Sequence, residues 1–115
     1  MDIVIKRAYT AASAEDGQRV LVDRLWPRGI SKDQAALAAW DKEIAPSTAL
    51  RERFHSGAID YAELERAYRA ELAAQPDALE RLRALSRQGR LSLIYGARDE
   101  VHNNAAILRD VLLGR

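Results

Sequence analysis

The stretch RVLVDRLWPRGIS, residues 19–31, marks the place where a buried strand leaves the core. Residues 20–22 are consecutive apolar residues, and a continuous apolar run is typical of a strand that is covered on both faces. Pro27 and Gly29 then end the strand. Because strands covered on both faces occur in parallel sheets with helices on each side, this stretch predicts an α/β fold.

Two other segments predict strands in the same sheet. Residues 3–5 form a short β-branched run, and residues 91–95 read LSLIY. The long segment between residues 25 and 90 allows a crossover, so we expect the second and third strands to be parallel. A parallel crossover needs about a dozen residues. The short first connection therefore allows either orientation for the first strand, and we favour the parallel one.

Capping signals divide the rest of the chain into about five helices. Their expected starts are Ser31, which pairs with Gln34 in a capping box, Ser47, Asp60, which pairs with Glu63, Pro76 and Asp99. The first helix would bury Leu37 and Trp40, and the last would run from about residue 100 to 113. We expect one domain, residues 1–115, with a small mostly parallel sheet of three to four strands flanked by about five helices.

Composition excludes several classes of protein. The chain has 115 residues with 18 basic and 17 acidic side chains, and this balance argues against a dedicated DNA-binding protein. It contains no cysteine, which removes disulfides, thiolate metal sites and thiol nucleophiles. No apolar run approaches the ~18 residues that span a bilayer. We expect a cytoplasmic protein without a membrane partner; its oligomeric state stays open.

The spacing of glycine and histidine also excludes familiar cofactor and metal sites. The glycines form neither GxGxxG nor a P-loop, and no serine lies in GxSxG. The two histidines, His55 and His102, are far apart in the sequence, which argues against a zinc site. No spacing of carboxylates indicates a magnesium cage. We therefore expect neither a metal nor a cofactor.

Polar residues gather where each predicted strand ends. In an open parallel sheet, ligands bind beyond the carboxyl ends of the strands. The first strand leads into Lys6, Arg7 and Tyr9, the second into residues 23–29, and the third into residues 95–103. If the three strands run in the same direction, these groups converge on one polar site.

The segment after the third strand predicts the chemistry of this site. A helix that starts at Asp99 would present free backbone N–H groups, which attract an anion. The guanidinium fork of Arg98 matches a phosphate or a carboxylate. Asp99 and His102 are three residues apart, so the carboxylate would orient the imidazole as a general base. Asn103 adds a hydrogen-bond donor and acceptor.

Structural roles for the same residues remain alternatives. Arg24 and Arg28 would then only pair with neighbouring acids, and Trp26 and Trp40 would belong to the core. Asp99 would serve as an N-cap and nothing more. His55 stands at a helix end, where an imidazole interacts with the helix dipole.

Three segments of the chain resemble the YeaO-like family of small bacterial proteins, which is classed as a domain of unknown function. These segments are RVLVDRLWPRGISK, KEIAPS and LIYGARDEVHNNAAIL, and the resemblance extends over nearly the whole chain. It implies a compact α/β domain. It marks as motif positions Asp23, Arg24, Trp26, Arg28, Gly29, Lys42, Glu43, Tyr95, Asp99, His102 and Asn103. Asn104 stands where a second histidine is common in the family, so a mechanism that needs this histidine is not expected.

We expect the strand-end site to bind a small molecule with a phosphate or a carboxylate, either as a binding protein or as an enzyme. The expected ligand-binding residues are Asp23, Arg24, Trp26, Arg28, Gly29, Lys42, Glu43, Tyr95, Arg98 and Asn103. The arginines would hold the anion, and the expected catalytic residues are His102 and Asp99. Two other hypotheses stay open on the sequence alone. One is a nucleic-acid-associated or regulatory module, and the other is a protein-interaction module with a structural charge network.

Overall fold

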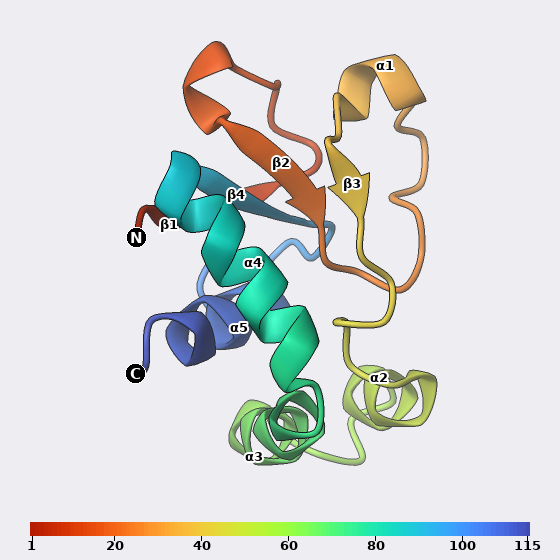
Figure 1. The fold of residues 1–115 in the computed structure, drawn as a ribbon. Helices are drawn as coiled ribbons and strands as arrows, with labels where there is room; N and C mark the ends of the chain where they lie inside the picture. The colour runs from red at the N-terminus through yellow and green to blue at the C-terminus, as the bar shows by residue number, and fades with distance from the viewer.

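The protein is built around a four-stranded parallel sheet. A computed structural model describes all 115 residues. The strands are β1 (Ile3–Arg7), β2 (Gln18–Leu21), β3 (Ala39–Trp40) and β4 (Leu91–Tyr95), in the order β1-β4-β2-β3 (Figure 1). Every neighbouring pair is parallel. The structure therefore confirms the predicted α/β class and the parallel orientation of the first strand.

The first predicted helix is much shorter than expected, and a strand takes its place. Ser31 caps α1 (Lys32–Ala35) in the predicted capping box with Gln34. Ala36 then adopts a left-handed conformation with φ 47°, which ends the helix after one turn. The prediction that this helix buries Leu37 and Trp40 is therefore wrong. Trp40 lies in β3, where the chain pairs with β2 instead.

The next three helices follow their capping signals. They are α2 (Thr48–His55), α3 (Tyr61–Ala73) and α4 (Pro76–Gln88). Ser47 caps α2, and Asp60 and Glu63 form the expected capping box on α3. Pro76 stands in the first turn of α4, where its missing N–H leaves no bond unmade. None of the helices is both long enough and apolar enough to cross a membrane.

The last helix starts later than predicted. α5 (Asn104–Leu112) is capped by Asn103, whose side chain accepts the N–H of Ala106. The prediction that Asp99 is the N-cap is therefore wrong. Asp99 Oδ1 instead accepts the backbone N–H groups of Val101 and His102, which holds residues 99–102 in a turn ahead of the helix.

Both faces of the sheet are covered, which explains the apolar run at residues 20–22. Val20 and Val22 belong to the larger apolar cluster, which the sheet shares with α2, α3, α4 and α5. Leu21 faces the other way and packs in a smaller cluster with Trp26 and Trp40 against it. The two tryptophan rings meet edge to face, with centroids 5.4 Å apart. Figure 1 shows α2 beyond the ends toward which the arrows of β2 and β3 point.

Candidate functional site

A cavity of about 290 Å³ lies beyond the carboxyl ends of β2 and β4. Its walls are residues 23–27 after β2, residues 45–46, three residues of α2 (Arg51, Phe54 and His55), Leu64 of α3, and residues 96–97 and 102–104 after β4. The volume stands at the lower end of the range for small-molecule pockets, roughly 300–1,000 Å³. As expected from the sequence, residues that follow β2 and residues that follow β4 line the same cavity.

The polar groups at the end of β1 and just after it do not line this cavity. Lys6 forms an ion pair of 2.9 Å with Asp16, which lies just before β2. Arg7 donates to the carbonyl of Ala97 and lies over the ring of Tyr9. Tyr9 in turn donates to the carbonyl of Arg28. Because β4 separates β1 from β2, the predicted convergence includes two of the three strand ends.

Asp23 is the carboxylate of the cavity. Its Oδ2 accepts the backbone N–H of Gly96 at 2.8 Å, which joins the ends of β2 and β4. A Cβ at position 96 would lie 3.2 Å from this oxygen, so the close approach favours glycine. Burial raises the pKa of Asp23 above its usual value. The bond from Gly96, the amide of Asn104 and the charges of His55 and Arg51 oppose this shift without cancelling it.

Arg24 lines the cavity, but two of its N–H groups already donate to carbonyls of the protein itself. Its Nε and Nη2 donate to the carbonyls of Pro46 and Ala45, at 3.1 and 3.3 Å. Its Nη1 lies 3.9 Å from Glu43, whose side chain is 84% exposed. Arg24 thus ties the KEIAPS loop to the end of β2.

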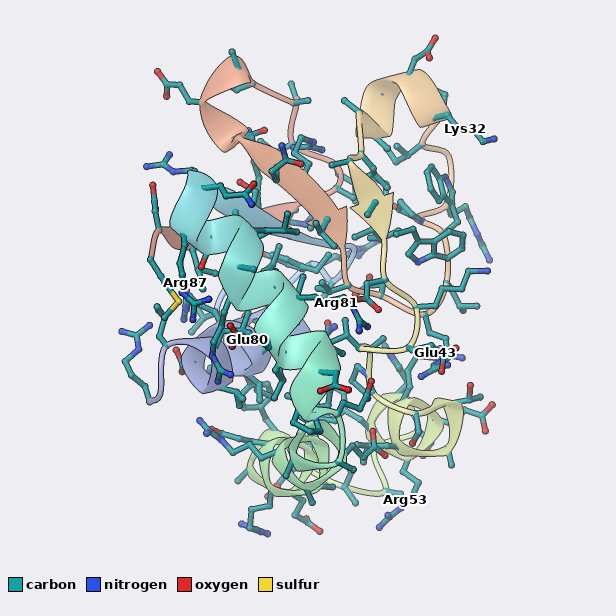
Figure 2. All side chains as sticks on the ribbon, in the orientation of Figure 1. Lys32, Glu43, Arg53, Glu80, Arg81 and Arg87 are labelled. Atoms are coloured by element: carbon teal, nitrogen blue, oxygen red, sulfur yellow. The ribbon has the colours of Figure 1, made fainter.

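The two charged residues at the start of the KEIAPS loop stay outside the cavity. Lys42 lies over the ring of Trp40, with its Nζ 4.1 Å from the centroid. Figure 2 shows Glu43 on the loop that leads from β3 to α2. Neither residue lines the cavity, so their predicted part in binding stays a prediction.

Arg51 is a charged wall residue that sequence reasoning missed. Its Nε is buried and has no hydrogen-bond partner. Arg51, Phe54 and His55 are spaced three and four apart on α2, so they share the helix face that lines the cavity. This spacing after the Ser47 cap is the signal that could have identified them. Sequence reasoning treated His55 only as a partner of the helix dipole.

The predicted Asp99–His102 pair forms, but it lies largely in water. His102 Nδ1 is 3.4 Å from Asp99 Oδ2, and the two side chains are 60% and 55% exposed. The N–H groups of His102 and Val101 lower the pKa of Asp99. The imidazole also packs edge to face on Tyr61 and lines the cavity. Its predicted role as a general base stays a prediction.

The side chains of the two asparagines that follow His102 form hydrogen bonds within the protein. Asn103 is buried; its Oδ1 caps α5 and its Nδ2 donates to the carbonyl of Asp99. Asn104 Nδ2 donates to the carbonyl of Val22 at 2.9 Å. Both residues line the cavity.

The remaining predicted site residues lie in different places. Trp26 lines the cavity, and its Nε1 donates to the carbonyl of Ile30. Tyr95 is buried in the core, where burial raises its pKa. Arg28, Gly29 and Arg98 are exposed and do not line the cavity. No group of three His, Asp or Glu side chains is placed to hold a metal ion.

Comparison with known proteins gives the family. The model of the family DUF488-N3i, described as "Inactive DUF488-N3 subclade", matches residues 2–115. Uncharacterized protein YeaO of Escherichia coli K12 is 47% identical over 97% of both chains. Uncharacterized protein Rv3073c of Mycobacterium tuberculosis H37Rv is 38% identical over 96% of this chain and 93% of its own. No solved structure shows a significant match to the chain.

Proposed function

The chain belongs to the YeaO-like DUF488-N3i family, the subclade described as inactive, and from this premise we propose that it binds an anionic small molecule without transforming it. The ligand lies in the cavity at the carboxyl ends of β2 and β4, as ligands of open parallel sheets generally do. Its anionic group is a carboxylate or a phosphate.

One observation carries this proposal: Arg51 lines the cavity, and its Nε is buried and has no hydrogen-bond partner. An unsatisfied buried donor costs about 1–3 kcal/mol, and more when it is charged. Arg51 forms no ion pair with any acid of the chain. A bound carboxylate or phosphate offers a planar or forked acceptor that matches a guanidinium.

The surroundings favour binding over catalysis. The candidate base, His102, and its partner Asp99 are more than half exposed, so water has free access to both side chains. The apolar walls, among them Phe54, Leu64 and Pro27, provide contact area for the body of a ligand but no reacting group. The description of the family as inactive agrees with this reading.

Thermal unfolding in the presence of phosphate, phenyl phosphate, 3-phenylpropanoate and nucleotides tests the proposal. A ligand at about 100 times its Kd adds about 2.7 kcal/mol of stability, which raises the Tm of a domain of this size by roughly 10 °C. We expect such a shift for at least one anion with an apolar body, and we expect Arg51→Met to remove it.

Three variants serve as controls for this experiment. Arg53 lies on α2 but points away from the molecule (Figure 2), so Arg53→Met should keep the full shift. Arg28→Ala and Arg98→Ala test the anion-binding roles that the sequence predicts for these residues. The absence of a shift with every anion, or a shift that Arg51→Met retains, would contradict the proposed function.

A further inference from the structure

Two of the charged side chains that line the cavity have opposite charges and do not form an ion pair with each other. Asp23 and Arg51 both line it, one from the end of β2 and the other from α2. The charges of His55 and, to a smaller extent, Arg51 lower the pKa of Asp23 against the effect of burial. The two side chains nevertheless form no ion pair, and the Nε of Arg51 stays without a partner.

Each of the two charged groups retains unused hydrogen-bonding capacity. An ionised carboxylate offers about four acceptor positions. Asp23 accepts one backbone N–H, from Gly96, and has the amide of Asn104 beside it. Both side chains are half-buried, and a charge that is partly removed from water without a partner of opposite sign is costly. A ligand that supplied a cation to Asp23 and an anion to Arg51 would relieve both costs at once.

The position of Asp23 also limits which anions can bind. A ligand of one negative charge that reached Arg51 in so small a cavity would lie close to the Asp23 carboxylate and would be repelled by it. A positive group on the same ligand removes this repulsion. Phe54 and Pro27, which also line the cavity, provide apolar contact surface.

We propose that the cavity takes a small zwitterion of the amino-acid class, whose anionic group pairs with Arg51 and whose ammonium group pairs with Asp23. This inference rests on the proposed function and names the class of ligand for the same site. The selectivity lies in Asp23, which distinguishes a zwitterion from a plain anion of the same shape. The body of the ligand is compact and apolar.

Titration calorimetry at neutral pH with three matched compounds tests this inference. L-Phenylalanine carries both charges, 3-phenylpropanoate only the anion, and 2-phenylethylamine only the cation. A second matched pair, 4-(aminomethyl)benzoate and 4-methylbenzoate, places the charges further apart. We expect one of the two zwitterions to bind at least tenfold more tightly than its singly charged partners.

Two variants assign this preference to its residues. Asp23→Asn keeps an oxygen that can accept from Gly96 and removes the charge, so the preferred zwitterion should bind no better than its anionic partner. Arg51→Met should weaken both of them by at least tenfold. Arg53→Met, on the outer side of α2, should leave every affinity unchanged. Circular dichroism confirms that each variant is folded.

The outcomes separate the two proposals. If 3-phenylpropanoate or 4-methylbenzoate binds through Arg51 and neither zwitterion binds more tightly than its anionic partner, the inference about the zwitterion is wrong and the anion-binding function stands. A tenfold preference that persists in Asp23→Asn would also overturn the inference, because the selectivity would lie elsewhere. If none of the anions or zwitterions binds, both proposals fail together.

Discussion

The two ends of β2 each carry an aspartate, and the two carboxylates have opposite surroundings. Asp16, in the short 3-10 helix Ala14–Asp16 just before β2, contacts Lys6 Nζ at 2.9 Å and Arg19 Nη1 at 2.7 Å. It also accepts the backbone N–H of Ser13. Asp23, just after β2, accepts one backbone N–H and touches no cation.

The pKa directions follow these surroundings. Burial alone would raise the pKa of Asp16, but its bonds with Lys6, Ser13 and Arg19 outweigh burial and lower it. The pKa of Asp23 is raised because burial outweighs its few partners. At the amino end of β2, the charged side chains form ion pairs that stabilise the fold. At its carboxyl end, Asp23 has no partner of opposite charge within the protein.

The largest expected effect comes from removing the charge at the amino end. Asp16→Asn leaves Arg19, whose side chain is 4% exposed, without its partner. Breaking a buried ion pair in this way costs about 3–5 kcal/mol. Urea unfolding measures the loss. The control is Asp2→Asn, which breaks an exposed pair with Arg90 and should cost at most about 1 kcal/mol. Equal losses in the two variants would contradict the structural role of Asp16.

A smaller loss of stability is expected for Arg24, a charged residue at the carboxyl end of β2 that does stabilise the fold. Arg24→Met removes the donors to Pro46 and Ala45, and buried carbonyls left without partners cost about 1–3 kcal/mol. Urea unfolding of this variant beside Arg28→Met, at an exposed position, measures the difference. If Arg24→Met unfolds at the same urea concentration as the wild type, the loop does not depend on Arg24.

The pH dependence of stability should differ in sign between the two ends. Because the pKa of Asp16 is lower in the folded state than its ordinary value of 3.8, its contribution is present above about pH 4 and is lost as the pH falls further. The pKa of Asp23 is raised in the folded state, so ionisation of its carboxyl destabilises the fold at neutral pH. As the pH falls toward 3.8, the carboxyl is protonated in the folded state and the free energy of unfolding of the wild type rises.

Unfolding free energies at a series of pH values test both signs. The advantage of the wild type over Asp16→Asn should shrink below about pH 4. For Asp23→Asn, the change falls between neutral pH and about pH 4. On acidification through this range, the free energy of unfolding of the wild type should rise relative to that of Asp23→Asn. Curves of the same sign for both variants would contradict the contrast between the two ends.

The smallest effect on stability is expected for Asp23 itself at neutral pH. Asp23→Asn keeps an acceptor for Gly96 and removes a buried charge, so the free energy of unfolding should stay within about 1 kcal/mol of the wild type or rise. Urea unfolding at pH 7 is the measurement. A loss as large as that of Asp16→Asn would mean that the Asp23 charge is structural after all.

Much of the fold could be predicted because its signals are local. The apolar run at residues 20–22 indicated a strand covered on both faces, and the caps at Ser47 and Asp60 placed α2 and α3. The strand β3 could not be predicted, because its two residues pair with β2 only after the chain turns at Ala36. Asp99 and Asn103 are both good N-caps, and tertiary packing, which local sequence does not record, selected Asn103.

The site could be predicted in position but only partly in composition. Asp23, Arg24, His102 and Asn103 follow the ends of β2 and β4, and the rule for parallel sheets located them. Arg51 comes from a helix that folds over the sheet edge, which depends on the path of the loop before it. The sequence also cannot tell a guanidinium that donates to backbone carbonyls, such as that of Arg24, from one without partners, because these carbonyls lie far along the chain.

Backbone amide shifts in a nitrogen-15 NMR titration with L-phenylalanine, and then with 3-phenylpropanoate, test the central claim most directly. The account predicts that the signals which move are those around the cavity, Gly96, Arg51 and Asn104, while those of Ser13, Asp16 and Arg19 stay in place. No shift with either compound, or shifts centred on the Asp16 end of β2, would contradict the claim that the free charges at the carboxyl end bind a ligand.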